Sequence, residues 1–399
     1  MTLFRILVLG GSGIFGRRLC ARLAAEPSCV VLLASRSRAR AEARCAEILR
    51  ERPAARIEAV SVTLPGELSG VLTALRPDLV IDASGPFQGR SLELPETCIA
   101  HGVHWLDLAD ARDYVRRFAG LNAAARAAGV VALSGASSLP GLSSVVVASL
   151  AQGLERLERV EIAILSAQRQ PRGLAMLEGV LETVGRPMTV LRNGRRRTVF
   201  GWQEARRLSP RDPLRAKLGR RWLGAFDAPD LDSLPASYPE LQDVRFHAGL
   251  EVSCAHLGLW ALSWPVRWGL VSRLTPLARG LGALADAVSL LGSERGGMQV
   301  GVTGQTAGGR RLRRGWRLVA EQGQGPWVPT LPALLVARRL ARLVAGERRA
   351  GPALDSGARA CINAFSLPEF EAAIAGLAIG TETTECPYPN DGETLARAA

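Results

Sequence analysis

Hydrophobic and polar residues follow a repeating order along the first 150 residues, in which short apolar runs alternate with longer amphipathic stretches. The apolar runs are rich in Val, Ile and Leu, which is typical of buried strands. The stretches between them, such as 17–25 and 38–50, place apolar residues at three- and four-residue steps and predict helices. We therefore predict an α/β fold for residues 1–150, with a doubly wound parallel sheet covered by helices on both faces. The expected strands are Arg5–Leu9, Cys29–Ala34, Arg56–Val62, Leu79–Ala83, His104–Leu106 and Val130–Leu133.

The pattern changes after residue 150. Longer runs of alternating character and the turn pairs Asn193-Gly194 and Gly308-Gly309 are typical of antiparallel hairpins. A helical stretch is expected over Leu257–Leu291. We predict a second, α+β domain with a largely antiparallel sheet in residues 151–325, and a C-terminal helical segment in residues 326–399 that packs back on the first domain. The expected strands are Val160–Leu165, Met188–Leu191, Arg197–Phe200, Val244–Val252, Met298–Thr303 and Gly315–Ala320.

Composition supports a folded chain with more than one core. The 399 residues are 47% hydrophobic and 22% charged, which excludes a disordered chain and allows two domains. The seven cysteines are dispersed without a Cys-x-x-Cys pair or a Cys/His cluster, so we expect no metal site and a reducing, cytoplasmic location. The run Val252–Val266 is shorter than the roughly 20 residues of a bilayer span, so no transmembrane helix is predicted.

The basic residues are unevenly distributed. Lys and Arg number 50 against 37 Asp and Glu, a net charge of +13. Twelve of the basic residues lie between Arg186 and Arg221, where the acidic residues are Glu204 and Asp212. A solvated basic face is the ordinary interpretation, and an anionic substrate or an acidic membrane surface are the alternatives. Without a zinc-finger spacing or an aromatic RNA-binding motif, no nucleic-acid partner is expected.

A glycine-rich turn links the first predicted strand to the first predicted helix. Its glycines fit Gly-x-Gly-x-x-Gly and the related Gly-x-x-Gly-x-x-Gly. Glycine permits the tight turn, lets backbone approach a pyrophosphate and lets the helix pack on the strand, while the helix N-terminus offers free N–H groups. This context predicts a Rossmann-type dinucleotide site; the alternative is a turn without a ligand. The predicted contacts are Gly10, Gly11, Ser12, Gly13, Ile14, Phe15 and Gly16.

The end of the second predicted strand indicates which dinucleotide binds. An NAD site carries Asp or Glu there to bind the ribose hydroxyls, whereas this chain has Ser35-Arg36-Ser37. An arginine with flanking hydroxyls suits a 2′-phosphate, which a carboxylate would repel. We predict NADP as the cofactor, with Arg36 as the main phosphate ligand beside Ser35 and Ser37. The alternative is a serine that caps the next helix and arginines that are only solvated.

Two further strand ends belong to the same predicted edge of the sheet. Ala83 ends the predicted strand 79–83, and Ser84, Gly85, Pro86 and Phe87 follow it, where the middle of the cofactor and its nicotinamide should pass. The segment 134–144 repeats this arrangement, and Ser137, Ser138, Pro140 and Gly141 are predicted substrate contacts. Helix capping is the alternative role for the two serines.

Asp107 is the candidate catalytic residue. It follows the predicted strand His104–Leu106 in the polar sequence His-Trp-Leu-Asp, where it could orient a substrate amine or relay a proton. The Tyr–Lys pair of the short-chain dehydrogenases is absent, because Lys217 is the only lysine and Pro213 stands four residues before it.

Several of these segments together resemble the saccharopine dehydrogenase/reductase NADP-binding family. The resemblance implies a Rossmann domain joined to an α/β substrate and dimerisation domain, hence a homodimer. It also implies NADPH-dependent reduction of an imine formed from an amino acid and an aldehyde or keto acid. An iminium already carries positive charge, so a hydride can arrive without a strong general acid. The segments are Gly10–Gly16, Ser35-Arg36, "VIDASGPFQG" (80–89), "HGVHWLDLAD" (101–110), "GASSLPGLSS" (135–144) and, in the C-terminal part, "GPWVPTLPALLVARRLA" (325–341).

The second predicted domain carries Trp260, Trp264 and Trp268 at four-residue steps, which places them on one helix face, although Pro265 should kink that helix. A core or dimer stripe is the ordinary interpretation, and a peripheral membrane contact with neighbouring arginines on anionic headgroups is the alternative.

Three functions follow from these features. The first is an NADP-dependent oxidoreductase acting on a C=N or C=O bond of a small amino or keto acid. The second is a reductase of a hydrophobic or lipid-linked substrate, similar to trans-acting enoyl reductases, and the third is a non-catalytic NADPH-binding sensor or scaffold.

Overall fold

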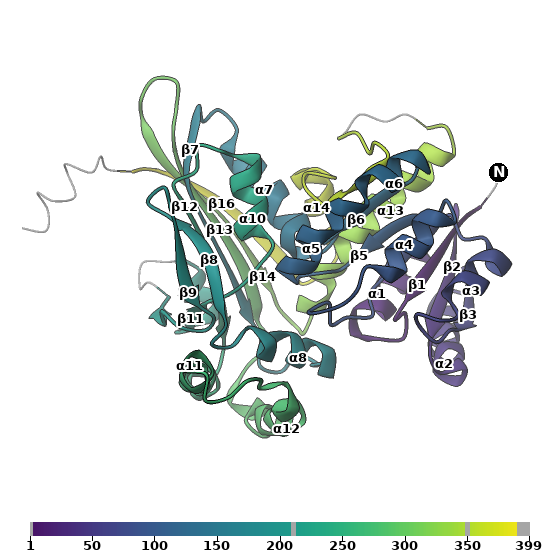
Figure 1. Cartoon of the computed structure of the whole chain (residues 1–399), viewed down its shortest axis with the longest axis horizontal. Coiled ribbons are helices and arrows are strands. Elements are labelled where there is room, and N and C mark those ends of the chain that lie inside the picture. The colour runs from purple at the N-terminus through teal and green to yellow at the C-terminus, as the bar shows by residue number, and fades with distance from the viewer. Residues whose placement is uncertain (1–2, 209–212, 348–351, 389–399) are drawn as a thin grey trace, which may run out of the picture. The chain divides into compact units, whose positions relative to one another are not determined.

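The computed structural model describes residues 3–208, 213–347 and 352–388, and the chain divides into two compact units (Figure 1). Unit 1 is assembled from Met1–Leu142, Pro171–Gly179 and Pro326–Ala373, and unit 2 from the remaining segments. These limits differ from the predicted ones, which divided the chain into consecutive segments with boundaries after residues 150 and 325. The stretch 143–150 groups with unit 2, and so do the residues from Ile374 onward.

Unit 1 is built on a parallel sheet, which confirms the predicted Rossmann-type fold. Within the described residues its strands lie in the order β15-β6-β5-β4-β1-β2-β3, and every neighbouring pair is parallel. Its strands are β1 (Phe4–Leu9), β2 (Cys29–Ser35), β3 (Ile57–Ser61), β4 (Leu79–Asp82), β5 (His104–Asp107), β6 (Val131–Ser134) and β15 (Gly357–Ala360). Its helices are α1 (Ile14–Leu23), α2 (Arg38–Glu51), α3 (Leu68–Leu75), α4 (Glu93–Ala100), α5 (Arg112–Phe118), η1 (Ala119–Leu121), α6 (Asn122–Ala127), η2 (Ser138–Leu142), η5 (Gly325–Thr330), α13 (Leu331–Val344) and α14 (Leu367–Ile374), and it shares α8 (Leu174–Thr183) with unit 2.

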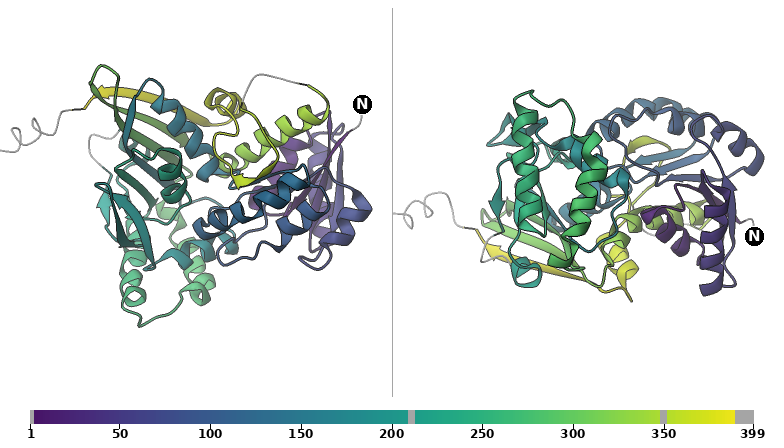
Figure 2. Two further views of the ribbon diagram at one scale, coloured as in Figure 1. Left: turned by 45° about the horizontal axis from the view of Figure 1, so that its top comes forward. Right: turned by 90° about the horizontal axis from the view of Figure 1, so that it is seen from below.

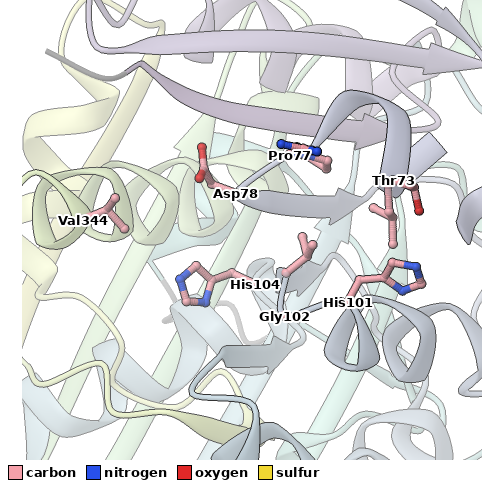
Figure 3. Close-up of a pocket in the computed structure, with 10 residues that line it drawn as sticks. Thr73, Pro77, Asp78, His101, Gly102, His104 and Val344 are labelled. Carbon is pink, nitrogen blue, oxygen red and sulfur yellow. The ribbon is translucent and has the colours of Figure 1, made fainter. Parts of the chain in front are cut away.

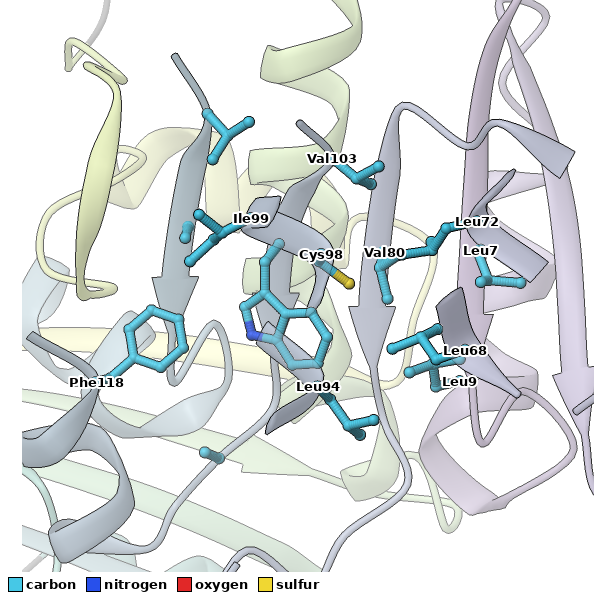
Figure 4. Packing of buried hydrophobic residues seen from close by; sticks show 14 of the residues in the cluster. Leu7, Leu9, Leu68, Leu72, Val80, Leu94, Cys98, Ile99, Val103 and Phe118 are labelled. Carbon is cyan, nitrogen blue, oxygen red and sulfur yellow. The ribbon is translucent and has the colours of Figure 1, made fainter. Parts of the chain in front are cut away.

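One face of this sheet packs against α3, α4 and α5. Figure 4 shows Leu7 and Val80 of the strands against Leu72, Cys98 and Phe118 of the helices, all of them buried. The strands are apolar at consecutive positions because both of their faces are covered, as the sequence pattern predicts. Helices α1 and α13 contact each other outside this cluster, so the C-terminal helix α13 is part of the same unit.

The strand order places a topological switch point between β1 and β4. From β1 the chain proceeds to β2 and β3 on one side, and it returns to β4 on the other side. In open parallel sheets, ligands bind outside the carboxyl ends of the strands at this point. The predicted glycine turn follows β1, and the predicted segment 83–87 follows β4, so both flank the switch point.

Unit 2 contains a larger, mixed sheet. Among the described residues the main path of strands is β10-β11-β12-β7-β13-β14-β16, and β8 joins it through β12 and pairs with β9. The pairs are antiparallel except β7 with β12, which run parallel, so the prediction of a largely antiparallel sheet is confirmed. Its strands are β7 (Arg156–Ser166), β8 (Pro187–Arg192), β9 (Arg195–Phe200), β10 (Arg206–Arg207), β11 (Trp222–Ala225), β12 (Asp243–Leu250), β13 (Gly296–Gln305), β14 (Arg311–Ala320) and β16 (Ile379–Pro387). Its helices are α7 (Ser143–Ala151), α9 (Pro213–Leu218), α10 (Asp230–Ser237), α11 (Ser253–Arg267), η3 (Thr275–Leu277), α12 (Ala278–Ala287) and η4 (Ser289–Leu291).

The helical stretch predicted over 257–291 is two separate helices, α11 and α12 (Figures 1 and 2). Pro265 does not interrupt α11 at once, since the helix ends two residues later at Arg267. The inner sides of both helices pack into a buried cluster that includes Trp202, Val266 and Ala278. Across the described ranges, no helix combines the length and apolar character that a bilayer crossing requires.

Candidate cofactor site

The turn after β1 requires glycine for backbone reasons. Gly10 has φ of +70°, a left-handed conformation that side chains disfavour, and a Cβ there would lie 2.7 Å from the Cα of Ser84. A Cβ on Gly16 would lie 2.2 Å from the carbonyl oxygen of Gly10, so the helix can approach the strand only with glycine here. The structure therefore explains the Gly10–Gly13–Gly16 spacing, while Gly11 packs against the side chain of Leu33 on β2.

Gly13 is exposed and is the N-cap of α1. A Cβ at this position would meet a single atom within 4 Å, the carbonyl oxygen of Gly10 at 3.1 Å, so the space in front of the helix is open. The first turn of α1 carries no acidic residue, and helix geometry leaves its N–H groups without intrahelical acceptors. An open, glycine-lined helix N-terminus at a switch point suits a diphosphate, because both the N–H groups and the helix dipole favour negative charge. Half-buried Ser12, Ile14 and Phe15 complete the predicted segment.

The residues after β2 lie next to this turn. The hydroxyl of Ser12 donates to the hydroxyl of Ser35 at 3.0 Å, which links the glycine turn to the end of β2. Arg36 is exposed, so its guanidinium is accessible to a ligand. The hydroxyl of Ser37 accepts a hydrogen bond from the N–H of Arg40 and caps α2. The helix-capping alternative is therefore correct for Ser37, and it leaves Arg36 as the charged group beside the turn.

The segment after β4 is held by an ion pair that sequence analysis missed. Asp82 is fully buried, and its Oδ1 accepts hydrogen bonds from the backbone N–H and the hydroxyl of Ser84, at 2.8 and 2.6 Å. Its other oxygen lies 3.0 Å from Nη1 of Arg90, whose Nη2 donates to the Ser84 hydroxyl at 3.1 Å. The buried carboxylate at the end of a strand was a signal for such a partner, because buried charges are almost always paired. Asp82 and Arg90 thus position Ser84 against Gly10.

The five residues predicted after β4 do not have equal access. Ala83, Ser84, Gly85 and Pro86 are half-buried, whereas the Phe87 side chain is buried. Its ring lies 5.3 Å from that of Tyr114 within the core cluster of unit 1. The prediction of a ligand contact is therefore not supported for the Phe87 side chain, because the apolar ring gains more from core burial.

Asp107 lies at the end of β5, as the sequence predicts, but its carboxylate is bonded to groups of the fold and is closed to solvent. It is fully buried, and its Oδ1 accepts hydrogen bonds from the N–H groups of Ala109 and Gly135 and from the hydroxyl of Ser134. Its Oδ2 accepts from the indole N–H of Trp105 at 3.0 Å. These bonds join the ends of β5 and β6. The carboxylate has no exposed surface on which a substrate could bind, so the proposed catalytic role is not carried forward.

Burial raises the pKa of Asp107 to about 6 against the opposing effect of its hydrogen-bond donors, and it raises the pKa of Asp230 to about 6 as well. A raised pKa in the folded state means that the native protein binds the proton more tightly than the unfolded chain. The contribution of each of these two groups to stability should therefore be largest below about pH 4 and be lost as the pH rises to about 6, by roughly 3 kcal/mol per group.

We expect Asp107→Asn to remove the contribution of Asp107 to this pH dependence, because the amide does not ionise. It should also cost about 1–3 kcal/mol, since the amide N–H₂ that replaces one oxygen cannot accept a hydrogen bond. Urea unfolding across this pH range would measure both effects. Asp113→Asn is the control: it removes an exposed carboxylate whose pKa is lowered by hydrogen bonds from Arg116 and Arg117, and it should leave the decline intact. If the free energy of unfolding of the Asp107 variant fell with pH as steeply as that of the unmodified chain, the raised pKa of Asp107 would be contradicted.

The segment predicted to bind substrate is largely packed. Ser137, Pro140 and Gly141 are buried, and Ser138 is half-buried. The carbonyl oxygen of Gly135 accepts the N–H of Gly141 at 3.1 Å, and a Cβ on Gly141 would lie 3.3 Å from Pro332 of α13. This turn therefore anchors the chain between β6 and α13, and Ser138 is the predicted substrate residue that retains exposed surface.

A cavity of about 410 Å³ lies at the opposite end of the strands, where β4 and β5 begin (Figure 3). Its polar lining is already engaged. The carboxylate of Asp78 accepts the N–H of Arg5 at 2.7 Å, and Nδ1 of His104 accepts the N–H of Val131 at 2.9 Å. Burial lowers the pKa of His104, so this ring is neutral near pH 7. His101, at the mouth, contacts the hydroxyl of Ser69. This cavity is separate from the switch point.

The arginine-rich segment 186–221 forms β8 to β10 and the residues up to β11 in unit 2; its residues 209–212 lie outside the described ranges. Several of its arginines are engaged in the fold. Arg192 pairs with Glu204, and Arg206 pairs with Glu161. Arg221 is buried and donates to the carbonyl oxygens of Ser166 and Arg295, at 2.7 Å each. The solvated-face interpretation fits Arg195, Arg196 and Arg197 of β9, which are exposed.

Comparisons with known proteins agree with this geometry. Residues 6–133 match the family described as the saccharopine dehydrogenase NADP binding domain. Among solved structures, saccharopine dehydrogenase (L-Glu forming) from Saccharomyces cerevisiae is 15% identical with a TM-score of 0.63, over 96% of this chain and all of that one. A protein of gentamicin A biosynthesis, solved in complex with NAD, is 14% identical with a TM-score of 0.42, over 97% of both chains. A search of curated proteins finds no significant match. The N-terminal part of the chain, residues 6–133, thus carries a nicotinamide-dinucleotide-binding domain of the saccharopine dehydrogenase NADP-binding family.

Proposed function

We propose that the protein is an NADP-dependent oxidoreductase that transfers a hydride to or from a C=N or C=O bond of a small amino or keto acid. The observation that carries this proposal is the juxtaposition of an open glycine turn at the N-terminus of α1 with the exposed Arg36 at the end of the neighbouring strand. The first feature suits a diphosphate and the second suits a phosphorylated ribose.

Different residues around the switch point would bind different parts of the cofactor. The N–H groups at Gly13 and the first turn of α1 would hold the diphosphate, and Arg36 would neutralise the 2′-phosphate beside Ser35. Ser84, fixed by Asp82 and Arg90, would border the path toward the nicotinamide. The bound cofactor would supply the hydride, and the protein would orient it and exclude water.

The substrate class rests on two supports. The yeast structure with the same fold is a saccharopine dehydrogenase. In addition, Asp107 has no exposed surface, so the structure gives no support to the acid–base residue suggested by sequence. An iminium substrate has the least need of such a group, because its positive charge already draws the hydride.

A second candidate is a reductase of a hydrophobic or lipid-linked substrate. It is favoured by the exposed leucine and tryptophan side chains of α11 and α12 in unit 2. A chain that acts on a lipid-linked group has a use for an apolar surface, which a catalyst of small, soluble amino acids does not need.

The test begins with calorimetric titration of the purified chain by NADPH and NADH. We expect NADPH to bind at least about tenfold more tightly, because only it carries the phosphate that Arg36 would contact. NADPH oxidation is then followed with pairs of amino acids and aldehydes or keto acids, and in parallel with acyl- and enoyl-thioesters. Turnover of an amino-acid pair supports the first candidate, and turnover of thioesters alone supports the second. The absence of heat with both coenzymes would overturn the cofactor assignment, and tight NADPH binding without turnover in either panel would favour the sensor interpretation over an enzyme.

A further inference from the structure

The outer surface of α11 and α12 is unusually apolar. Twelve large hydrophobic side chains are exposed in the described part of the chain, and eight of them lie between residues 253 and 292. Single exposed leucines are ordinary on a protein surface, but so many large apolar side chains exposed in one short segment suit an interaction site. We call this surface the α11–α12 face. Its members include Trp260, Trp268, Leu270, Leu284, Leu290 and Leu291.

The helices do not need this face in order to fold. The inner side of α12 contributes Ala278 and Leu281 to the buried cluster of unit 2, and α11 contributes Val266. The outer side of α12 nevertheless exposes Leu284 and Ala287 beside the charged Arg279 and Asp286. A surface helix normally carries mostly polar residues on its outer side. Packing of the core does not explain the exposed apolar residues.

Most charged residues within the segment 253–292 are positive. Between residues 253 and 292 the sequence contains Arg267, Arg273 and Arg279, and Asp286 is the only acidic residue. Arg273 and Arg279 are exposed, whereas the guanidinium of Arg267 donates to Oε1 of Gln203 at 2.6 Å and lies 4.2 Å from the ring centroid of Phe200. A fourth, Arg169, borders the face, where its guanidinium donates to the carbonyl oxygens of Ser289 and Leu290 at 3.4 and 3.2 Å. A surface of leucine and tryptophan with arginines near it suits a lipid bilayer. The apolar side chains can enter the acyl layer while the arginines bind anionic headgroups.

We propose that the α11–α12 face docks on an anionic phospholipid surface. The leucines enter the outer part of the acyl layer, the tryptophans lie at headgroup level, where their indole rings are favoured, and the arginines contact lipid phosphates. The rings of Trp260, Trp264 and Trp268 form a continuous row along α11. The centroids of the first two rings are 6.1 Å apart, and those of the last two are 5.5 Å apart. The contact is peripheral, since α11 spans 15 residues and α12 spans 10, both shorter than a bilayer crossing needs.

Charge favours a lipid surface over a second copy of the chain. A two-fold contact through this face would bring the same patch of both protomers together. The arginines of this segment from both copies would then lie in one interface, with Asp286 of each copy as the acidic residue of the segment to offset them. Like charges at an interface disfavour association. An anionic headgroup layer instead supplies an opposite charge for every arginine.

Sedimentation of the full chain with vesicles tests the proposal. We expect binding to equimolar phosphatidylcholine and phosphatidylglycerol vesicles, and at least about tenfold weaker binding to pure phosphatidylcholine vesicles. The double variant Leu290→Ser/Leu291→Ser removes side chains that are 81% and 74% exposed, so folding should be retained. Its partition onto the anionic vesicles should fall by about tenfold or more. Arg273→Gln/Arg279→Gln should lower binding to anionic vesicles by a similar factor and leave binding to neutral vesicles unchanged.

The matched control is Leu343→Ser/Val344→Ser, which removes two exposed apolar side chains from the end of α13 in unit 1. It should bind vesicles as the unmodified chain does. Equal loss in this control, or no binding of the unmodified chain to anionic vesicles, would overturn the proposal. So would a dimer in sedimentation velocity that Leu290→Ser/Leu291→Ser converts to a monomer, because the face would then be a protein interface. NADPH titration of every variant separates this test from the proposed function, since the cofactor affinity should not change.

Discussion

Replacing Gly13 with valine is expected to weaken the binding of both NADPH and NADH by more than about 100-fold, or about 2.7 kcal/mol. The two coenzymes share the diphosphate, and the valine side chain would occupy the space through which that group reaches the N–H groups of α1. The fold should persist. The backbone of Gly13 is extended, with φ of −75°, which any residue adopts, and its Cβ would meet only the Gly10 carbonyl oxygen at 3.1 Å. Calorimetric titration with each coenzyme, together with a thermal melt, would measure the effect.

Gly120→Val is the matched control for this variant. Gly120 belongs to the same unit and is exposed, and a Cβ there would have no atom within 4 Å. We expect its cofactor affinities to equal those of the unmodified chain. Normal titration of the Gly13 variant by both coenzymes would show that the glycine turn is not the diphosphate site. Gly16 is unsuitable for this purpose, because a Cβ at 2.2 Å from Gly10 would disturb the turn itself.

The variant Arg36→Asp is expected to reverse the preference between coenzymes. NADPH should lose about 100-fold or more in affinity, because a charge-assisted contact to its 2′-phosphate is replaced by repulsion. NADH should bind as before or somewhat better, since the new carboxylate can accept hydrogen bonds from the ribose hydroxyls. The substitution is exposed and follows β2 directly, so stability should change by less than about 0.5 kcal/mol. Parallel titrations with NADPH and NADH would give the ratio of the two affinities.

Arg50→Asp makes the same change of charge at the other end of α2, where the residue is also exposed. It should lower NADPH affinity only slightly, through the general loss of positive charge, and should not change the ratio. If the Arg36 variant lost affinity for both coenzymes equally, the guanidinium would not be the group that recognises the phosphate. This result would leave the glycine turn as a dinucleotide site without a preference set by Arg36.

Most strands of unit 1 were predictable because they are buried on both faces; β3, in which Glu58 and Ser61 are exposed, is an exception. Each of the six predicted strands lies within one residue of its observed limits, and apolar runs such as Leu79-Val80-Ile81 contain no competing pattern. The edge strand β15 could not be found this way, because its residues Gly-Ala-Arg-Ala lack the β-branched side chains that indicate a strand.

The strand order of the sheet in unit 2 could not be predicted from the alternation of apolar and polar residues. Alternation of residues tells which side chains share a face, and it does not tell which strands are neighbours. The parallel pairing of β7 with β12 joins residues about 84 positions apart, such as Arg159 with Asp243. Strand β16 lies in a segment expected to be helical, although its threonines Thr381, Thr383 and Thr384 were a local signal for a strand.

The candidate site was predictable where backbone geometry dictates the residue. Gly10 and Gly16 stand out because no side chain fits there. Arg90 was missed because its partner Asp82 is separated from it by an irregular loop without a periodic pattern. Asp107 was misinterpreted for a related reason. A carboxylate at a strand end can serve a substrate or can bind the N–H groups of adjacent strands, and sequence position is the same in both cases.

The path of the chain between the two units limits how the protein can be dissected. The polypeptide passes from one unit to the other five times, at residues 142, 170, 179, 325 and 373. A fragment that stopped at Leu142 would lose β15, whose pairing covers the outer edge of β6, and would also lose α13. The unpaired edge of β6 and the apolar surface that α13 covers would then be exposed, and both promote aggregation. Recombinant work on the coenzyme-binding half therefore calls for the intact polypeptide or for a redesigned connection that joins residue 142 to residue 326.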